Sequence, residues 1–150
     1  MKIGFLENLP VLQEKLEKDL KNLPFRKELV LESAREEGDY DLLLCDKNYL
    51  PASLPFQSKI FLVPGSARVP VLPEKGIFLT GGMNREDAVS FSSIGENCAF
   101  LCLEKEIFLP KKSILPFEQK IPFDRNYSLY KNLATGFAKI LVTLIFTEEL

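Results

Sequence analysis

The sequence predicts a single α/β domain over residues 1–150, Rossmann-like and three-layered, with a mainly parallel sheet that antiparallel strands extend in the C-terminal half. Three observations lead to this fold class. Short apolar runs alternate with a helical repeat in the first half, adjacent apolar runs separated by turns replace them after residue 88, and two apolar runs end in glycine-led polar loops. A chain of this length needs no disulfide to fold.

The first strand and the first helix are predicted from the N-terminal residues. Residues 2–6 form the apolar run of a buried strand. Asn8 is expected to cap the helix that follows, Pro10 suits its first turn, and Pro24 ends it. The leucines that recur at helical spacing are Leu9, Leu12, Leu16, Leu20 and Leu23.

Four further strands are predicted in the parallel part. Residues 28–33 fit a strand, although the same stretch can open a short helix through residue 37. Residues 41–46 form a clear buried strand. Residues 48–57 lack a helical period, so a loop or one helical turn leads to the strand predicted over residues 60–63. Residues 77–80 are the next predicted strand.

The C-terminal half predicts antiparallel strands and a helix. Residues 88–94 and 98–103 form a hairpin, and residues 106–109 and 117–123 add two short strands. Asp124 or Asn126 is expected to cap the final helix. Its apolar stripe, interrupted by a lysine and too short for a bilayer span, predicts a core helix that can also form a homodimer. The stripe contains Leu129, Leu133, Phe137, Ile140, Leu141 and Leu144.

Composition excludes several function classes. The net charge of −2 argues against a general nucleic-acid binder, and the chain contains no histidine for a Ser-His-Asp, Cys-His or His-containing zinc site. Three cysteines, with no signal-like apolar segment, favour a cytoplasmic setting. Neither a metal nor a cofactor is expected.

The glycine-led loops are the candidate ligand site. Residues 64–68 and 81–87 each follow a predicted strand, and parallel strands bring their carboxyl ends to one edge of a sheet. Glycine lets the backbone approach an anion, while hydroxyl and guanidinium groups can bind it. The candidate ligand-binding residues are Asp46, Gly65, Ser66, Arg68, Gly81, Gly82, Asn84 and Arg85.

Other interpretations of the two loops need no ligand. The first loop lacks the spacing of a Walker or dinucleotide fingerprint, and a tight turn with a solvated arginine accounts for it. In the second loop, Asn84 can cap a single helical turn, with Glu86 and Asp87 at its positive end.

Residues 79–94 carry a resemblance to two groups of proteins. The strand, the glycine turn, the polar residues and the following strand resemble a stretch late in the central domain of Mur ligases. The same stretch resembles small uncharacterised proteins of anaerobic bacteria, which implies a bacterial origin. The phosphate loop, catalytic carboxylate and histidine of Mur ligases have no counterpart here, so the resemblance does not imply ligase activity.

Three functions are compatible with these patterns. The first is a non-catalytic binding or regulatory domain for a small anionic ligand or a protein partner. The second is a histidine-independent enzyme acting on a phosphorylated or nucleotide-like substrate, with Asp46 or Asp87 as base and Arg68 or Arg85 holding charge. The third is a structural subunit that dimerises through the C-terminal helix.

Overall fold

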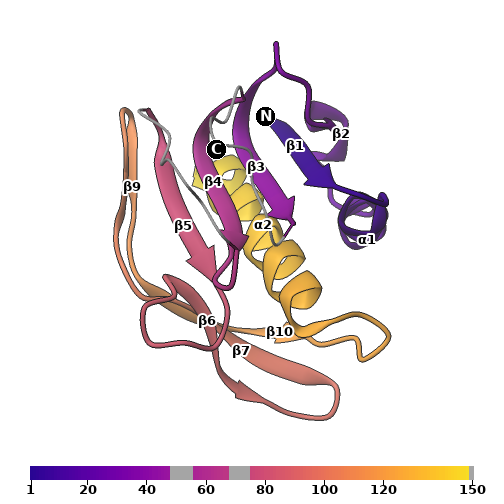
Figure 1. The fold of residues 1–150 in the computed structure, drawn as a ribbon, viewed down its shortest axis with the longest axis vertical. Helices are drawn as coiled ribbons and strands as arrows, with labels where there is room; N and C mark the ends of the chain where they lie inside the picture. The colour runs from indigo at the N-terminus through magenta and orange to yellow at the C-terminus, as the bar shows by residue number, and fades with distance from the viewer. Residues whose placement is uncertain (48–55, 68–74, 149–150) are drawn as a thin grey trace.

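A computed structural model of the chain gives one large sheet, with eight of the described strands in the order β10-β7-β6-β5-β4-β3-β1-β2 (Figure 1). The structure describes residues 1–47, 56–67 and 75–148. Most of the connection expected over residues 48–57 is therefore outside the described residues, and so is Arg68. The parallel strands are β1 (Lys2–Glu7), β2 (Val30–Ser33), β3 (Asp39–Asp46), β4 (Gln57–Pro64) and β5 (Ile77–Gly81).

Three antiparallel strands extend this sheet. β6 (Val89–Ile94) joins β5 through one parallel pair, Gly81 with Val89, and then pairs antiparallel with β7 (Cys98–Leu103), which pairs with β10 (Phe117–Pro122). The three strands lie across the carboxyl ends of the parallel strands (Figure 1). The predicted fold class is therefore confirmed as α/β with a mainly parallel sheet, consistent with a Rossmann-like three-layer fold.

Two short strands stand apart from the large sheet. β8 (Ile107–Leu109) was expected to belong with the other antiparallel strands, but it pairs with β9 (Lys112–Ile114), which the sequence patterns did not indicate. Ile107 and Ile114 are buried in the main core, whereas Phe108 is 70% exposed. The hairpin therefore packs on the core through one face only.

The helices begin later than the sequence predicted. The N-cap position of α1 (Val11–Leu20) is Pro10, whose side chain cannot cap the helix, and Asn8 does not cap it either. α2 (Leu129–Glu148) follows Ser128, whose hydroxyl accepts the Lys131 N–H at 3.2 Å, so neither Asp124 nor Asn126 is its cap. The strand predicted over residues 28–33 is present as β2, but it begins at Val30, after a short 3₁₀ turn, η1 (Arg26–Glu28).

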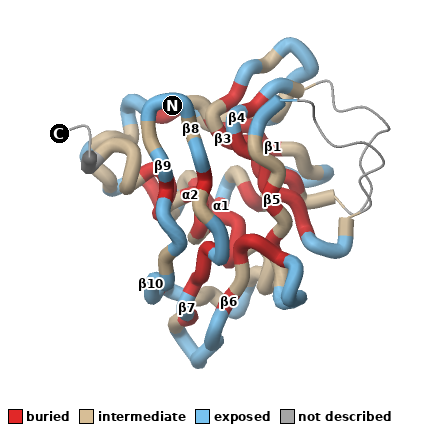
Figure 2. Tube along the Cα trace, turned by 90° about the vertical axis from the view of Figure 1, so that its left-hand side faces the viewer, coloured by how far each residue is buried: buried red, intermediate tan, exposed pale blue. Residues whose placement is uncertain are grey.

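The main core lies between the sheet and the two helices. It includes Leu12, Leu16 and Leu20 of α1, Leu133 and Phe137 of α2, and inward residues of nine of the described strands. Figure 2 shows the buried positions along the strands and the exposed ones at the turns. The opposite face of the sheet carries two smaller clusters, around Tyr40 and Phe61 and around Cys45 and Val63.

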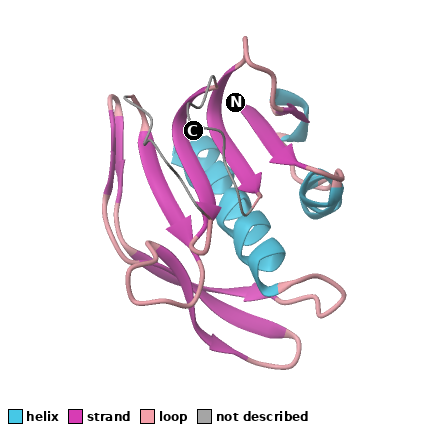
Figure 3. Ribbon diagram, viewed as in Figure 1, coloured by secondary structure: helices cyan, strands magenta, loops and turns pink. Residues whose placement is uncertain are grey.

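α2 is the central helix of this core. It contacts β3, β5, β6, β7 and α1, and passes behind the parallel strands (Figure 3). Its segment Leu129–Phe146 is long and apolar enough to cross a membrane, with a mean hydropathy of 1.3, but half of that segment is buried inside the fold. The predicted apolar stripe therefore packs within the chain's own core.

Candidate functional site

The two glycine-led loops lie side by side, as their strands predicted. Pro64 at the end of β4 is in register with Gly81 at the end of β5, and the Gly65 N–H donates to the Gly81 carbonyl at 2.8 Å. Ser66 and Arg85 are exposed beside them. The carboxyl edge of the sheet thus brings the described candidate residues of both loops together.

The side chain of Asp87 fills the space between these loops. Asp87 is only 4% exposed, and its Oδ2 accepts the Asn84 N–H at 2.9 Å. A Cβ atom at Gly65 or Gly82 would clash with this carboxylate. The two glycines therefore allow close approach of an internal anion, and Asp87, rather than Asn84, caps the turn.

Asp46 ends β3 at the same edge and forms an ion pair. Its Oδ2 lies 3.0 Å from the Lys131 Nζ of α2. Beside it, the Tyr130 hydroxyl donates to the Cys45 carbonyl at 2.5 Å. Burial raises the pKa of Tyr130 well above its ordinary value, and burial also raises the pKa of the Cys45 thiol to about 11. The ion pair and the Tyr130 hydrogen bond fix α2 to the sheet, while the Tyr130 hydroxyl and the Cys45 thiol are held in their protonated, less reactive forms.

A third carboxylate at this edge was not recognised in the sequence. Glu7 ends β1, and its Oε1 and Oε2 accept the N–H groups of Leu12 and Gln13 at 2.8 and 3.0 Å. It therefore occupies the N-terminus of α1, where an α/β protein can bind a phosphate. Its signal in the sequence was only an acidic residue between a strand and a helix.

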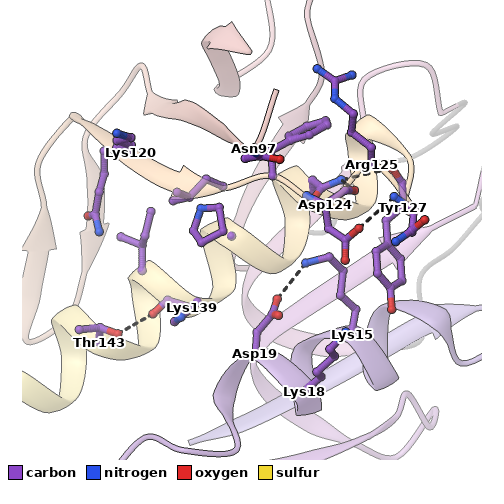
Figure 4. Close-up of a pocket in the computed structure, with 18 of the residues that line it drawn as sticks. Lys15, Lys18, Asp19, Asn97, Lys120, Asp124, Arg125, Tyr127, Lys139 and Thr143 are labelled. Carbon is purple, nitrogen blue, oxygen red and sulfur yellow. Dashed lines mark hydrogen bonds and ion pairs between the residues drawn. The ribbon is translucent and has the colours of Figure 1, made fainter. Parts of the chain in front are cut away.

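A cavity of about 900 Å³ lies away from this edge, and we call it the basic cleft. α2 forms its floor, α1 and β10 form its two walls, and residues 123–127 close one end (Figure 4). Asn132, only 1% exposed, holds that end in place: its Oδ1 accepts the Asp124 N–H, and its Nδ2 donates to the Asp124 and Tyr127 carbonyls.

No family model, curated protein or solved structure matches this chain. Its function must therefore be inferred from the geometry of its sites. Within the described residues, no group of three or more acidic or cysteine side chains is placed to hold a metal ion. None of Asp46, Asp87 and Arg85, which the enzyme hypothesis would use, lines the basic cleft.

The lining of the basic cleft has an excess of positive charge. Five basic residues and three acidic residues line it, although the whole chain carries a net charge of −2. The basic residues are Lys15, Lys18, Lys120, Arg125 and Lys139, and the acidic residues are Asp19, Glu96 and Asp124.

The partners of these cations differ. Lys15 is 7% exposed, with its Nζ 2.9 Å from Asp19 Oδ2 and 5.3 Å from the centre of the Tyr127 ring. Arg125 donates to the backbone carbonyls of the turn between β6 and β7. By contrast, Lys18, Lys120 and Lys139 form no ion pair with another described residue.

No short motif indicated this cleft. Its cations come from α1, β10, the loop before α2 and α2 itself, and more than a hundred positions separate the first from the last. A helical projection shows the lysines of α1 among several charges and shows Lys139 of α2 as an interruption of an apolar stripe. Only the tertiary fold brings them to one cavity.

Proposed function

We propose that the protein is a non-catalytic binding domain of the bacterial cytoplasm that takes an anionic ligand in the basic cleft. The observation that carries this proposal is a large cavity lined by five basic and three acidic residues in a chain whose net charge is negative. A cavity whose lining carries an excess of positive charge attracts anions. Three free thiols support the cytoplasmic setting.

Lys18 and Lys139 are the best placed to attract the ligand. They lie on different walls of the cleft, α1 and the floor helix α2, and neither is neutralised by a described carboxylate. Lys15 contributes less, because Asp19 already compensates its charge. An anion held between Lys18 and Lys139 would link the two helices.

The side chains of the cleft favour binding over catalysis. The chain has no histidine, and Asp19, the carboxylate on α1, is bonded to Lys15. Asp124 accepts the Asn126 N–H at 2.9 Å, so it is engaged in the turn before α2. Histidine, the most common general base, is therefore absent, and two of the three carboxylates of the lining are engaged within the fold.

Titration with sodium tripolyphosphate, followed by thermal unfolding and calorimetry, tests the proposal. We expect saturable binding that raises the free energy of unfolding, by about 2.7 kcal/mol at a hundredfold excess over Kd. The double variant Lys18→Glu, Lys139→Glu should lose at least tenfold in affinity.

The matched control is Lys27→Glu, Lys105→Glu, which makes the same change in net charge at two exposed lysines outside the cleft. It should keep the affinity within about threefold, because exposed charges at a distance are screened. Equal losses in the two double variants, or no saturable binding by the unmodified protein, would overturn the cleft as an anion site.

A further inference from the structure

β10 presents a free strand edge to the basic cleft. It is the last strand in the order of the large sheet and is bonded on one side to β7. Residues 119–122, which form most of this strand, line the cleft. An unpaired strand edge is a template to which an extended segment can add.

The register shows which backbone groups face outward. The Phe123 N–H donates to the Asn97 carbonyl at 2.9 Å, one position beyond the pair of Pro122 with Cys98. Hydrogen-bonded pairs alternate along an antiparallel ladder, so residues 121, 119 and 117 bond to β7. Glu118 and Lys120 therefore direct their N–H and C=O groups away from β7.

Pro122 supports this assignment. Like Glu118 and Lys120, Pro122 directs its backbone groups away from β7, so its missing N–H removes no hydrogen bond to β7. No hydrogen bond joins the outward N–H or C=O groups of Glu118 and Lys120 to another part of the described chain. Two complete pairs of backbone groups are thus available on the cleft side of β10.

Charge selects the occupant of this edge. Lys18 of α1 and Lys139 of α2 both line the cleft, so a segment beside β10 would lie in a cleft with an excess of cations. A second copy of the chain would bring the same lysines together, which like-charge repulsion disfavours. A phosphate backbone would satisfy the lysines but not the alternating N–H and C=O groups of the strand edge.

We propose that the basic cleft takes an extended acidic segment of a partner protein, which adds as a strand to the free edge of β10. The proposal rests on the proposed function, because it needs the cleft to attract anions, and it names the class of ligand. Main-chain bonds to Glu118 and Lys120 hold the segment, and its carboxylates lie near Lys18 and Lys139.

Backbone-modified peptides test the proposal with the full chain. The probe is an acetylated hexapeptide amide in which Glu and Val alternate, together with two analogues that are N-methylated at all Glu or at all Val positions. Alternate N–H groups of an added strand point to the same neighbour. We expect one analogue to bind at least tenfold more weakly than the probe and the other to bind within about threefold.

A substitution in β10 separates the backbone from the charge. Lys120→Pro and Lys120→Gln both remove the charge, but only the proline also removes an outward N–H. We expect Lys120→Pro to bind the peptide at least fivefold more weakly than Lys120→Gln, while the two variants bind tripolyphosphate equally. Circular dichroism and the melting temperature verify that both variants are folded.

The outcomes distinguish this proposal from the proposed function. If both analogues bind like the probe, or no peptide binds while tripolyphosphate still does, strand addition is wrong and the anion site stands. If tripolyphosphate fails as well, the proposed function falls with it. A concentration-dependent dimer that Lys120→Pro abolishes would identify a second copy as the occupant and overturn the proposal.

Discussion

At the scale of single residues, carboxylates of the chain itself occupy the positions at which α/β proteins bind anions. Glu7 bonds two N–H groups at the start of α1, Asp87 fills the space between the glycine-led loops, and Asp46 is paired with Lys131. Each carboxylate does for the fold what a bound anion does in a ligand site. The ligand site predicted at this edge stays a prediction.

Glu7 is expected to stabilise the fold measurably. Glu7→Ala should lower the free energy of unfolding by about 1–2 kcal/mol, because the N–H groups of Leu12 and Gln13 lose their acceptors. Denaturation in urea measures the change. Glu14→Ala is the control, since Glu14 lies exposed in the first turn of the same helix and should cost less than about 0.5 kcal/mol. Equal losses would show that Glu7 does not act as a cap.

Some of these residue roles followed from the sequence and others did not. The glycines at 65 and 82 were predicted to admit close approach of the backbone to an anion, and in the structure the Asp87 carboxylate lies against both of them. Asn8 was predicted to cap α1 because asparagine is a common cap. Glu7 takes that role because the turn after β1 directs its carboxylate at the helix.

At the scale of elements, a close backbone contact between β4 and the residue before β5 requires a glycine. Gly76 precedes β5 with a φ of +92°, a conformation that residues with a Cβ rarely adopt, and its missing side chain makes room for the Ser58 carbonyl at the start of β4. The strands themselves were predictable from their apolar runs. β9 was not, because Lys112–Ile114 contains a single apolar residue and so forms no apolar run.

Gly76→Ala tests this contact between β4 and the start of β5. We expect the free energy of unfolding to fall by about 2–3 kcal/mol, because alanine combines a strained φ with a backbone clash. Gly95→Ala is the matched control: its φ is not positive, and the nearest atom to its added Cβ is the Cys98 carbonyl oxygen, at 3.2 Å. A Gly76→Ala variant as stable as the control would contradict the geometry. Thermal and urea unfolding both report the difference.

At the scale of the whole molecule, β3 is anchored at both ends. At its amino end, Asp41 accepts the Lys2 N–H of β1 at 2.8 Å and pairs with Lys59 of β4 at 2.9 Å. At its carboxyl end, Asp46 pairs with Lys131 of α2. The central strand is therefore tied to two neighbouring strands and to the core helix.

The anchor at Asp41 makes stability depend on acid pH. Burial raises the pKa of Asp41, but the Lys2 N–H and the Lys59 ammonium outweigh burial and hold the pKa below its ordinary value of 3.8. A carboxyl with a lowered folded pKa stabilises the fold above its unfolded pKa and loses that contribution as the pH falls through the folded value. The affected range therefore begins near pH 4 and extends below it.

Asp41→Asn should flatten this dependence. We expect the variant to be less stable than the unmodified chain at neutral pH by up to about 1 kcal/mol, with a difference that shrinks in acid. Urea unfolding at a series of pH values measures it. Asp39→Asn, an exposed neighbour on the same strand, is the control and should leave the slope unchanged. A constant difference at all pH values would mean that the ionised form of Asp41 has no special role.

The fold class was predictable because local patterns determine it: apolar runs, turns and helical spacing each lie within a few residues of one another. The basic cleft was not, because α1, β10 and α2 form it only after the sheet has brought them together. In the sequence Lys18 looks like any solvated lysine, and Lys139 is recognised only as an interruption of an apolar stripe. Their grouping is a property of the tertiary structure.

The central position of α2 has a consequence for synthesis of the chain on the ribosome. All the described strands precede α2 in the sequence, and their core-facing residues pack against it. Translation delivers residues at a limited rate, and a domain folds once its parts have emerged. Until α2 emerges, much of the apolar face of the sheet lacks its cover, so the nascent chain is open to chaperones and to aggregation until its last helix arrives.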